Sequence, residues 1–256
     1  MKNIWYFVIV VLLIASCAKS DSPGGPGSSE GKGGSMARFA ISGDVLYTVS
    51  TDSLKVFNIE DAANPKYSDQ RNLKVGFDIE TVFPMDTLLF IGSRSGMYVF
   101  DIKEPRFPIF LSQVSHIRSC DPVVAQDKYA YVTLNTNFSS CGASANNVLD
   151  IYDISDPLKP VLKRTLPLKG PTGLGVDGAK LFVCDKGLKV FNITDPLNIR
   201  QTDDLVDIDQ VNIREAYDVI PVDGLLILVA KEGLFQFDYT GDKLRFVSKI
   251  EIKPKR

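Results

Sequence analysis

Apolar and polar residues alternate in short runs along residues 36–256, and no stretch of this region keeps a helical period. The runs are interrupted every few positions by Gly, Asp, Asn or Pro. Short apolar runs bounded by such residues are typical of strands joined by tight turns. The pattern therefore predicts an all-β fold.

One motif occurs five times in this region: an apolar residue, an aromatic residue and then Asn or Asp. The copies are LKVFNIEDAANP (54–65), MYVFDIKEP (97–105), LDIYDISDP (149–157), LKVFNITDP (188–196) and LFQFDYTGD (234–242). Each copy has an apolar strand and a turn upstream and a more polar strand downstream, and the period lies near that of propeller blades. The repeat predicts a five-bladed β-propeller of four-stranded antiparallel blades. The final strand, KLRFVSKIEI (243–252), completes the fifth copy in order, so we expect no strand exchanged between the last blade and the first.

The Asn or Asp that follows each aromatic residue has two interpretations. These residues are Asn58, Asp101, Asp153, Asn192 and Asp238. Five equivalent carboxylates would suggest repeated metal sites, but Asn occupies two of the positions and the clustered acids of a calcium loop are missing from the sequence. We therefore expect side chains that accept turn N–H groups and end the strand.

The repeats resemble those of the LVIVD-repeat propellers, a group common among bacterial envelope proteins. The resemblance covers nearly all of 36–256 and is strongest at 129–160 and 179–200, where YDISDP (152–157) and LKVFNITDP (188–196) occur. The last copy departs from the pattern, with YTGD (239–242) in place of the Pro turn. The resemblance implies a propeller and an envelope location, and it implies no catalytic residue.

The first 17 residues have the layout of an export signal, with Lys2, an apolar run over 4–14 and small residues before Cys17. The ending Ile14-Ala15-Ser16-Cys17 resembles a bacterial lipobox, which implies that Cys17 is diacylated and begins the mature chain. The alternative is an ordinary secretory signal with Cys17 incidental. Residues 18–35 are rich in Gly, Ser and Pro and are expected to form a flexible tether. Ala18 next to the Cys implies an outer-membrane lipoprotein, and the side of that membrane stays open.

Composition narrows the possible chemistry. The chain has 29 Lys and Arg against 31 Asp and Glu, a net charge of −2, so it lacks the basic surface of a nucleic-acid-binding protein. Because the chain has one His, a His-rich zinc site is excluded. A Ser-His-Asp triad would have to use that residue, His116. We expect no metal and no cofactor. The single Trp, Trp5, lies in the export signal, so the mature chain has no Trp platform for a sugar.

The other cysteines are Cys120, Cys141 and Cys184. An exported domain meets an oxidising compartment, and Cys120 and Cys141 flank one predicted hairpin, so we expect a disulfide between them. Cys184 ends an apolar strand and is expected in the core. The long loop over 136–147 is either a binding loop on the rigid scaffold or a neutral insertion.

Alignment of the five copies brings polar residues to the starts of the innermost strands, around the mouth of the central channel. The alignment brings Arg38, Glu80, Asp121, Thr172, Tyr217 and Asp218 to this rim. The candidate site also includes His116, Arg118, Phe138 and Arg214, with Glu215 nearby. Such a funnel could hold a polar ligand or an ion. Solvation of a wet channel alone would also place polar residues there.

Three functional hypotheses follow. The first is a monomeric outer-membrane-anchored binding module that holds a protein or glycan partner on the propeller face without catalysis. The alternative is a glycoside hydrolase-like enzyme that uses Glu80, Asp121 and Asp218 as acid and base or nucleophile. In the third, the carboxylates only stabilise a calcium- or water-filled channel and the interaction surfaces lie elsewhere.

Overall fold

The computed structural model describes residues 33–115, 122–137, 147–205, 207–208 and 211–252. Within these ranges the regular structure is entirely β. No helix among them is long and apolar enough to cross a membrane.

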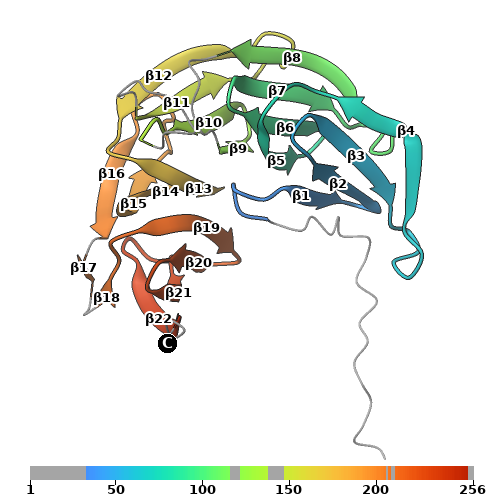
Figure 1. The fold of residues 1–256 in the computed structure, drawn as a ribbon. Coiled ribbons are helices and arrows are strands. Elements are labelled where there is room, and N and C mark those ends of the chain that lie inside the picture. The colour runs from blue at the N-terminus through green and yellow to red at the C-terminus, as the bar shows by residue number, and fades with distance from the viewer. Residues whose placement is uncertain (1–32, 116–121, 138–146, 206, 209–210, 253–256) are drawn as a thin grey trace, which may run out of the picture.

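Five four-stranded sheets follow one another along the chain (Figure 1). Blade 1 contains β1 (Phe39–Ser42), β2 (Val45–Val49), β3 (Ser53–Asn58) and β4 (Lys66–Lys74). Blade 2 contains β5 (Ile79–Met85), β6 (Leu88–Ser93), β7 (Gly96–Asp101) and β8 (Ile109–Ser115). Blade 3 contains β9 (Val123–Gln126), β10 (Tyr129–Leu134), β11 (Val148–Asp153) and β12 (Val161–Pro167). Blade 4 contains β13 (Pro171–Asp177), β14 (Lys180–Asp185), β15 (Gly187–Asn192) and β16 (Arg200–Leu205), and blade 5 contains β19 (Ala216–Val222), β20 (Leu225–Ala230), β21 (Gly233–Asp238) and β22 (Arg245–Glu251).

Every sheet is antiparallel, and its strands are paired in sequence order from the inner edge to the outer edge. A small hairpin of β17 (Asp207–Ile208) and β18 (Val211–Asn212) lies between blades 4 and 5. The predicted all-β propeller of five four-stranded blades is confirmed. The last blade is built from consecutive strands up to β22, so the expectation that no strand is exchanged with blade 1 is also confirmed.

Two local features recur in each blade and explain the repeated sequence. A residue with positive φ forms the turn between the first and second strands: Gly43, Asp86, Asp127, Gly178 and Asp223. The register of the third strand against the fourth shifts directly before the repeated aromatic residue, as between Ile151 and Tyr152. Gly, Asn and Asp are the residues that most readily adopt a positive φ, so the repeated Gly or Asp specifies the tight turn. The bulge increases the local twist of the strand pair, so the blades share one twist.

The Asn or Asp after the aromatic residue serves the turn, as the sequence predicts. In every blade its Oδ1 accepts a hydrogen bond from the backbone N–H two residues later, at 2.7 to 3.0 Å. A second Asx turn follows at Asp61, Asp156 and Asp195. In blade 3, the hydrogen bond from the N–H of Ser155 is the main reason that the pKa of the Asp153 carboxyl lies below its usual range.

A pH-dependent contribution to stability follows from the lowered pKa of Asp153. Because the folded-state value is below the unfolded one, the stabilisation is present above the unfolded pKa and is lost as the pH falls through the folded pKa. We expect Asp153→Asn, which keeps an acceptor but no charge, to melt slightly below wild type at neutral pH and together with it in acid. Asp153→Ala, which removes the acceptor, should melt lower at every pH. Thermal melts across the acid range test this, and equal melts of all three proteins at neutral pH would contradict it.

Hydrophobic cores lie between consecutive blades. Four clusters join blade 1 to 2, 2 to 3, 3 to 4 and 4 to 5. Tyr131 of blade 3, for example, is 1 % exposed in the cluster shared with Leu174 and Leu181 of blade 4. Middle blades therefore bury both faces, and their second strands are near-continuous buried runs, as in β6, β10 and β14.

The ring of blades is interrupted between blade 5 and blade 1 (Figure 1). No hydrophobic cluster among the described residues combines these two blades. The N-terminal strap, residues 33–36, links the two sides of this seam. Ser35 Oγ donates to Asp218 Oδ1 at 3.0 Å and accepts from the N–H of Leu174 at 2.8 Å, and the N–H of Met36 donates to Asp218 Oδ2. Ser35, placed in the tether by the sequence, is 1 % exposed because both of its bonds lie against the inner strands of blades 4 and 5.

Candidate functional site

The inner strands surround a central channel with two cavities. One, of about 160 Å³, lies within the ring and is lined by residues of all five inner strands, including Ala40, Val82, Val124, Leu174 and Val219. The other, of about 380 Å³, lies where the inner strands begin. We call this second cavity the funnel; it is lined by Met36, Arg38, Glu80, Pro122, Asn135, Pro171, Thr172 and Tyr217.

The funnel brings together four of the residues that the sequence placed at the rim. Arg38 directly precedes β1, and Glu80, Thr172 and Tyr217 are each the second residue of their inner strand. They meet because equivalent positions of a repeated unit converge around the channel.

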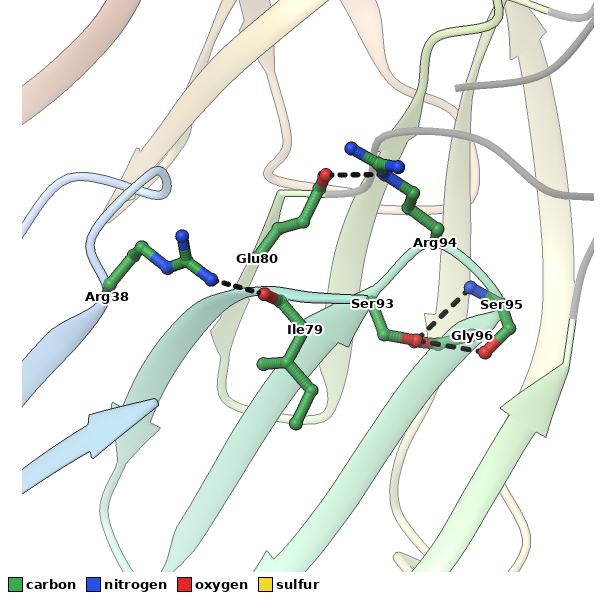
Figure 2. A network of polar contacts seen from close by, with 7 residues as sticks. All are labelled: Arg38, Ile79, Glu80, Ser93, Arg94, Ser95 and Gly96. Atoms are coloured by element: carbon green, nitrogen blue, oxygen red, sulfur yellow. Dashed lines mark hydrogen bonds and ion pairs between the residues drawn. The ribbon is translucent and has the colours of Figure 1, made fainter. Parts of the chain in front are cut away.

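Polar side chains of the funnel are engaged within the protein. Figure 2 shows Arg38 donating to the backbone oxygen of Ile79, at 2.8 Å, and Arg94 donating from Nε to Glu80 Oε1, at 2.9 Å. In the adjoining turn of blade 2, Ser93 Oγ donates to the Gly96 oxygen and accepts from the N–H of Ser95. Thr172 Oγ1 donates to the oxygen of Ala216 at 2.7 Å and so connects blade 4 to blade 5.

Pro171 lines the funnel, and the two residues before it are held by a buried carboxylate. Asp185 Oδ1 accepts from the N–H groups of Lys169 and Gly170, at 2.9 and 2.7 Å. Its Oδ2 lies 3.1 Å from Lys189 Nζ, and the Asp185 side chain is fully buried. From blade 3, the side-chain amide of Asn135 donates to the oxygen of Pro171. Pro171 is therefore fixed from two blades.

Asp218 departs from its expected place on the exposed rim. Its carboxylate lines neither cavity and faces the strap, where it accepts from Ser35 and Met36 and also from its neighbour's N–H, that of Val219. Burial raises the pKa of Asp218, and the hydrogen bonds oppose this only in part. Gly34 packs so closely that a Cβ there would lie 2.0 Å from Asp218 Oδ2. Asp218 thus holds the strap.

Removal of the strap's hydroxyl is expected to destabilise the protein. In Ser35→Ala the buried N–H of Leu174 loses its acceptor and Asp218 loses a donor, which costs about 1 to 3 kcal/mol and lowers Tm by roughly 2 to 10 °C. Ser42→Ala, on the partly exposed end of β1, is the matched control and should melt near wild type. Scanning calorimetry provides the measurement, and an unchanged Tm in Ser35→Ala would contradict the role of the strap.

The raised pKa of Asp218 predicts the opposite pH trend from that of Asp153. An acid whose folded pKa lies above its unfolded pKa contributes stability below the unfolded value, and this is lost as the pH rises through the folded pKa. The Tm of Asp218→Asn relative to wild type should therefore rise from acid to neutral pH. A constant offset across that range would show that the charge of Asp218 does not matter.

Other predicted site residues lie elsewhere or outside the described ranges. His116, Arg118, Asp121, Phe138 and the predicted disulfide partners Cys120 and Cys141 belong to undescribed segments. Arg214 is exposed in the segment before β19, and Glu215 forms an ion pair with Lys231 at 2.9 Å. Cys184 is a buried free thiol, as predicted, and burial raises its pKa well above the usual value. Among the described residues no group of three or more acidic, Cys or His side chains is arranged to hold a metal ion.

The repeat alignment misses two residues that line the funnel and one exposed aromatic residue that is close to Glu80 in sequence. Met36 and Pro171 line the cavity, but Met36 precedes β1 and Pro171 is the first residue of β13, so both lie at or beyond the start of the repeated unit. Phe77, before β5, is 80 % exposed and is an aromatic side chain close in sequence to Glu80. The sequence indicates an exposed position for Phe77 only locally, because this large apolar residue lies between Gly76 and Asp78, two residue types that favour turns. Asp78 has a positive φ of 53°.

Comparison with the sequence patterns of known protein families gave no match, and neither did comparison with curated protein sequences. Solved structures show the fold. A protein of unknown function from Desulfotomaculum acetoxidans aligns over 84 % of this chain and 69 % of its own, with 12 % identity and a TM-score of 0.65. AztD from Citrobacter koseri aligns over 84 % and 60 %, with 14 % identity and a TM-score of 0.59.

Hsv2 from Kluyveromyces lactis aligns over 82 % of this chain and 60 % of its own, with 10 % identity and a TM-score of 0.52. In these alignments with AztD and Hsv2, this chain matches 60 % of the other protein's length, which is less than two thirds. These likenesses support the propeller fold, whereas membership of the LVIVD-repeat group stays a prediction.

Proposed function

We propose that this chain is a lipid-anchored protein of the bacterial outer membrane that binds a partner protein through the funnel, without catalysis. The export signal, the lipobox-like Cys17 and the Gly/Ser/Pro-rich segment support the anchor. The propeller fold is compatible with an interaction module, since it presents loops and linking segments on a rigid scaffold.

The observation that carries the proposal is the lining of the funnel. Thr172 and Asn135 already donate to backbone oxygens, and Arg38 and Glu80 each have an internal partner. What the cavity offers in addition is apolar surface from Met36, Pro122, Pro171 and Tyr217. An apolar side chain of a protein segment fits such a site better than a sugar, which needs polar groups on the protein to satisfy its hydroxyls.

The glycoside hydrolase alternative gains no support from the described carboxylates. Glu80 is paired with Arg94, and Asp218 is turned toward the strap. Glu80 lines the funnel and Asp218 does not, so these two carboxyls do not face one cavity as a paired acid and nucleophile must.

Site-specific photo-crosslinking tests binding at the funnel. We expect the full-length protein with a photoreactive phenylalanine analogue in place of Tyr217, which is 44 % exposed, to form discrete adducts with an envelope protein in cells. The same analogue in place of Phe107, 48 % exposed in the turn between β7 and β8, is the matched control and should give none. Met36→Glu, which charges the cavity, should abolish the Tyr217-site adduct. No adduct at position 217, or equal adducts at both positions, would overturn the proposal, and binding to a glycan panel would favour the other partner class.

The anchor has a separate test. Radiolabelled palmitate should be incorporated into the wild-type protein and not into Cys17→Ala, and the variant should leave the outer-membrane fraction. Label retained by Cys17→Ala would exclude lipidation at this residue.

A further inference from the structure

A polar groove of about 680 Å³ lies on blades 3 and 4 and shares no lining residue with the funnel or with the cavity inside the ring. It lies beside the turn that leads from β15 into β16, the outer strand of blade 4 (Figure 1). Its volume is typical of sites that bind small molecules. We call it the outer groove; it is lined by Arg164, Asn192, Thr194, Asp195, Asn198, Ile199, Arg200 and Thr202.

Arg164 reaches the outer groove from blade 3 and is held there by blade 4. It lies on β12, and its Nη1 donates to the backbone oxygen of Leu197 in the turn. A guanidinium has five N–H donors in one plane, so this bond leaves others for a ligand. The guanidinium is therefore positioned at the groove by the contact between the two blades.

Arg200, the first residue of β16, brings a second guanidinium to the groove. Within the part of the chain that the structure describes, its guanidinium forms no hydrogen bond or ion pair. The hydroxyl of Thr194 has no partner in these ranges either, and Asn192 uses its Oδ1 alone, for the N–H of Thr194. Donor groups thus exceed the acceptors that the protein supplies to them.

Asp195, the acid among the described lining residues, is occupied by its own turn. Its Oδ1 accepts from the N–H of Leu197 at 3.0 Å, and its Oδ2 accepts from the side-chain amide of Asn198 at 2.7 Å. These bonds hold the pKa of Asp195 below its usual range, with the bond from Asn198 as the largest cause. Asp195 is therefore ionised at neutral pH. Two Arg against one Asp give the lining a net charge of +1.

Blade 1 contains the same turn with the opposite charge. Register against the outer strand places Lys66 opposite Asn58, as it places Arg200 opposite Asn192. Glu60 stands two residues after Asn58, where blade 4 has Thr194, and it pairs with Arg106 of blade 2 at 2.9 Å. Two acids against one Lys give that lining a net charge of −1, so the positive groove is particular to blade 4. The blade 1 cavity is lined by Asn58, Glu60, Asp61, Asn64 and Lys66.

We propose that the outer groove binds a sugar acid, whose carboxylate accepts hydrogen bonds from Arg164 and Arg200. The planar fork of a guanidinium matches the two oxygens of a carboxylate. A net charge of +1 also suits a carboxylate better than a phosphate monoester, which carries about −1.5 to −2 at pH 7.

The rest of the lining favours a hydroxylated ligand over an apolar one. Ile199, the apolar residue among those that line the groove, is 5 % exposed and offers a ligand little apolar surface. Asn192 and Thr194 supply neutral donors, and Oδ1 of Asn198 is an acceptor that no described group uses. Such amide and hydroxyl groups satisfy the hydroxyls of a sugar ring. This site is separate from the funnel, so it does not depend on the partner protein proposed there.

Equilibrium dialysis of the full-length protein in detergent against radiolabelled glucuronate tests the proposal. Wild type should bind, and Arg200→Gln should bind roughly tenfold or more weakly, because it loses a charged hydrogen-bond donor. Thr194→Glu, which copies the acid of blade 1, should also weaken binding. Lys66→Gln, the equivalent change in blade 1, is the matched control and should bind like wild type. All three side chains are exposed, so the variants are expected to fold.

Competition with related sugars tests the part played by the carboxylate. Glucose, which is neutral, should not displace glucuronate, and a glucose phosphate should displace it less well than unlabelled glucuronate does. Wild type that does not bind glucuronate overturns the proposal, as does an Arg200→Gln variant that binds like wild type. Displacement by glucose, or stronger displacement by the phosphate, would also contradict it. Glucuronate binding that is kept in Met36→Glu and lost in Arg200→Gln places the sugar in the outer groove and leaves the proposal for the funnel to its own test.

Discussion

Asp185→Ala is expected to lower the free energy of unfolding by about 3 to 5 kcal/mol, the cost of removing one partner of a buried ion pair. Asp185 is fully buried and holds Lys189 together with the N–H groups of Lys169 and Gly170. Alanine leaves the two N–H groups without an acceptor and the ammonium without its counter-ion. Denaturant titration measures the loss.

Three further variants separate charge from hydrogen bonding. Asp185→Asn keeps one acceptor and removes the charge, so it should fall between wild type and Asp185→Ala. Lys189→Met should cost less than Asp185→Ala, because Asp185 keeps both backbone donors. In the double variant Asp185→Ala/Lys189→Met the loss should be smaller than the sum of the single losses, since residues in one network couple. Additive losses would show that the pair does not act as a unit.

The same substitution should affect the funnel. Asp185 fixes the segment that leads into Pro171 and Thr172, both of which line the cavity. We therefore expect Asp185→Ala to reduce crosslinking from the Tyr217 position at temperatures where the variant is still folded. Unchanged crosslinking in a folded but less stable variant would assign Asp185 to stability alone.

Much of the fold could be predicted because each blade repeats the same set of residues, whose structural effects are local. The turn residues before the second strand, the aromatic residue at the bulge and the Asn or Asp after it act within a few residues of one another. Asn58 and Asp153, far apart in sequence, make the same hydrogen bond for this reason. Local geometry of this kind is legible in a single sequence.

The candidate site was predictable only in part, because its remaining features depend on how the blades meet. Tyr217 and Asp218 are neighbours on one strand, and successive side chains of a strand point to opposite faces. Tyr217 faces the funnel, whereas Asp218 faces Ser35, a residue of the predicted tether. A count of five repeats also does not determine whether the ring closes, since closure depends on the accumulated rotation between blades.

Phe182→Ala is expected to lower the free energy of unfolding by about 3 to 5 kcal/mol, because it removes a buried aromatic side chain. Phe182 is 0 % exposed between blades 4 and 5, and its ring packs edge-on against Tyr239 with centroids 5.2 Å apart. Phe77→Ala is the matched control, because that ring is 80 % exposed and its loss should change stability by less than about 0.5 kcal/mol. Equal Tm values for the two variants would contradict this account of the core.

The position of Phe182 also predicts which part of the protein opens first. Blade 5 packs one face on blade 4, and no hydrophobic cluster among the described residues joins its other face to blade 1. The interface that Phe182 fills is therefore the main hydrophobic contact of blade 5 within the described ranges. Hydrogen exchange in Phe182→Ala should accelerate in β19–β22 well before blades 2 and 3, because stability in a repeated structure depends on nearest-neighbour interfaces. Phe90→Ala removes an equally buried ring between blades 2 and 3, each of which also has another neighbour. Hydrogen exchange in Phe90→Ala should therefore accelerate across several blades together. The same uniform pattern in Phe182→Ala would contradict the prediction, because it would mean that blade 5 is covered on both faces.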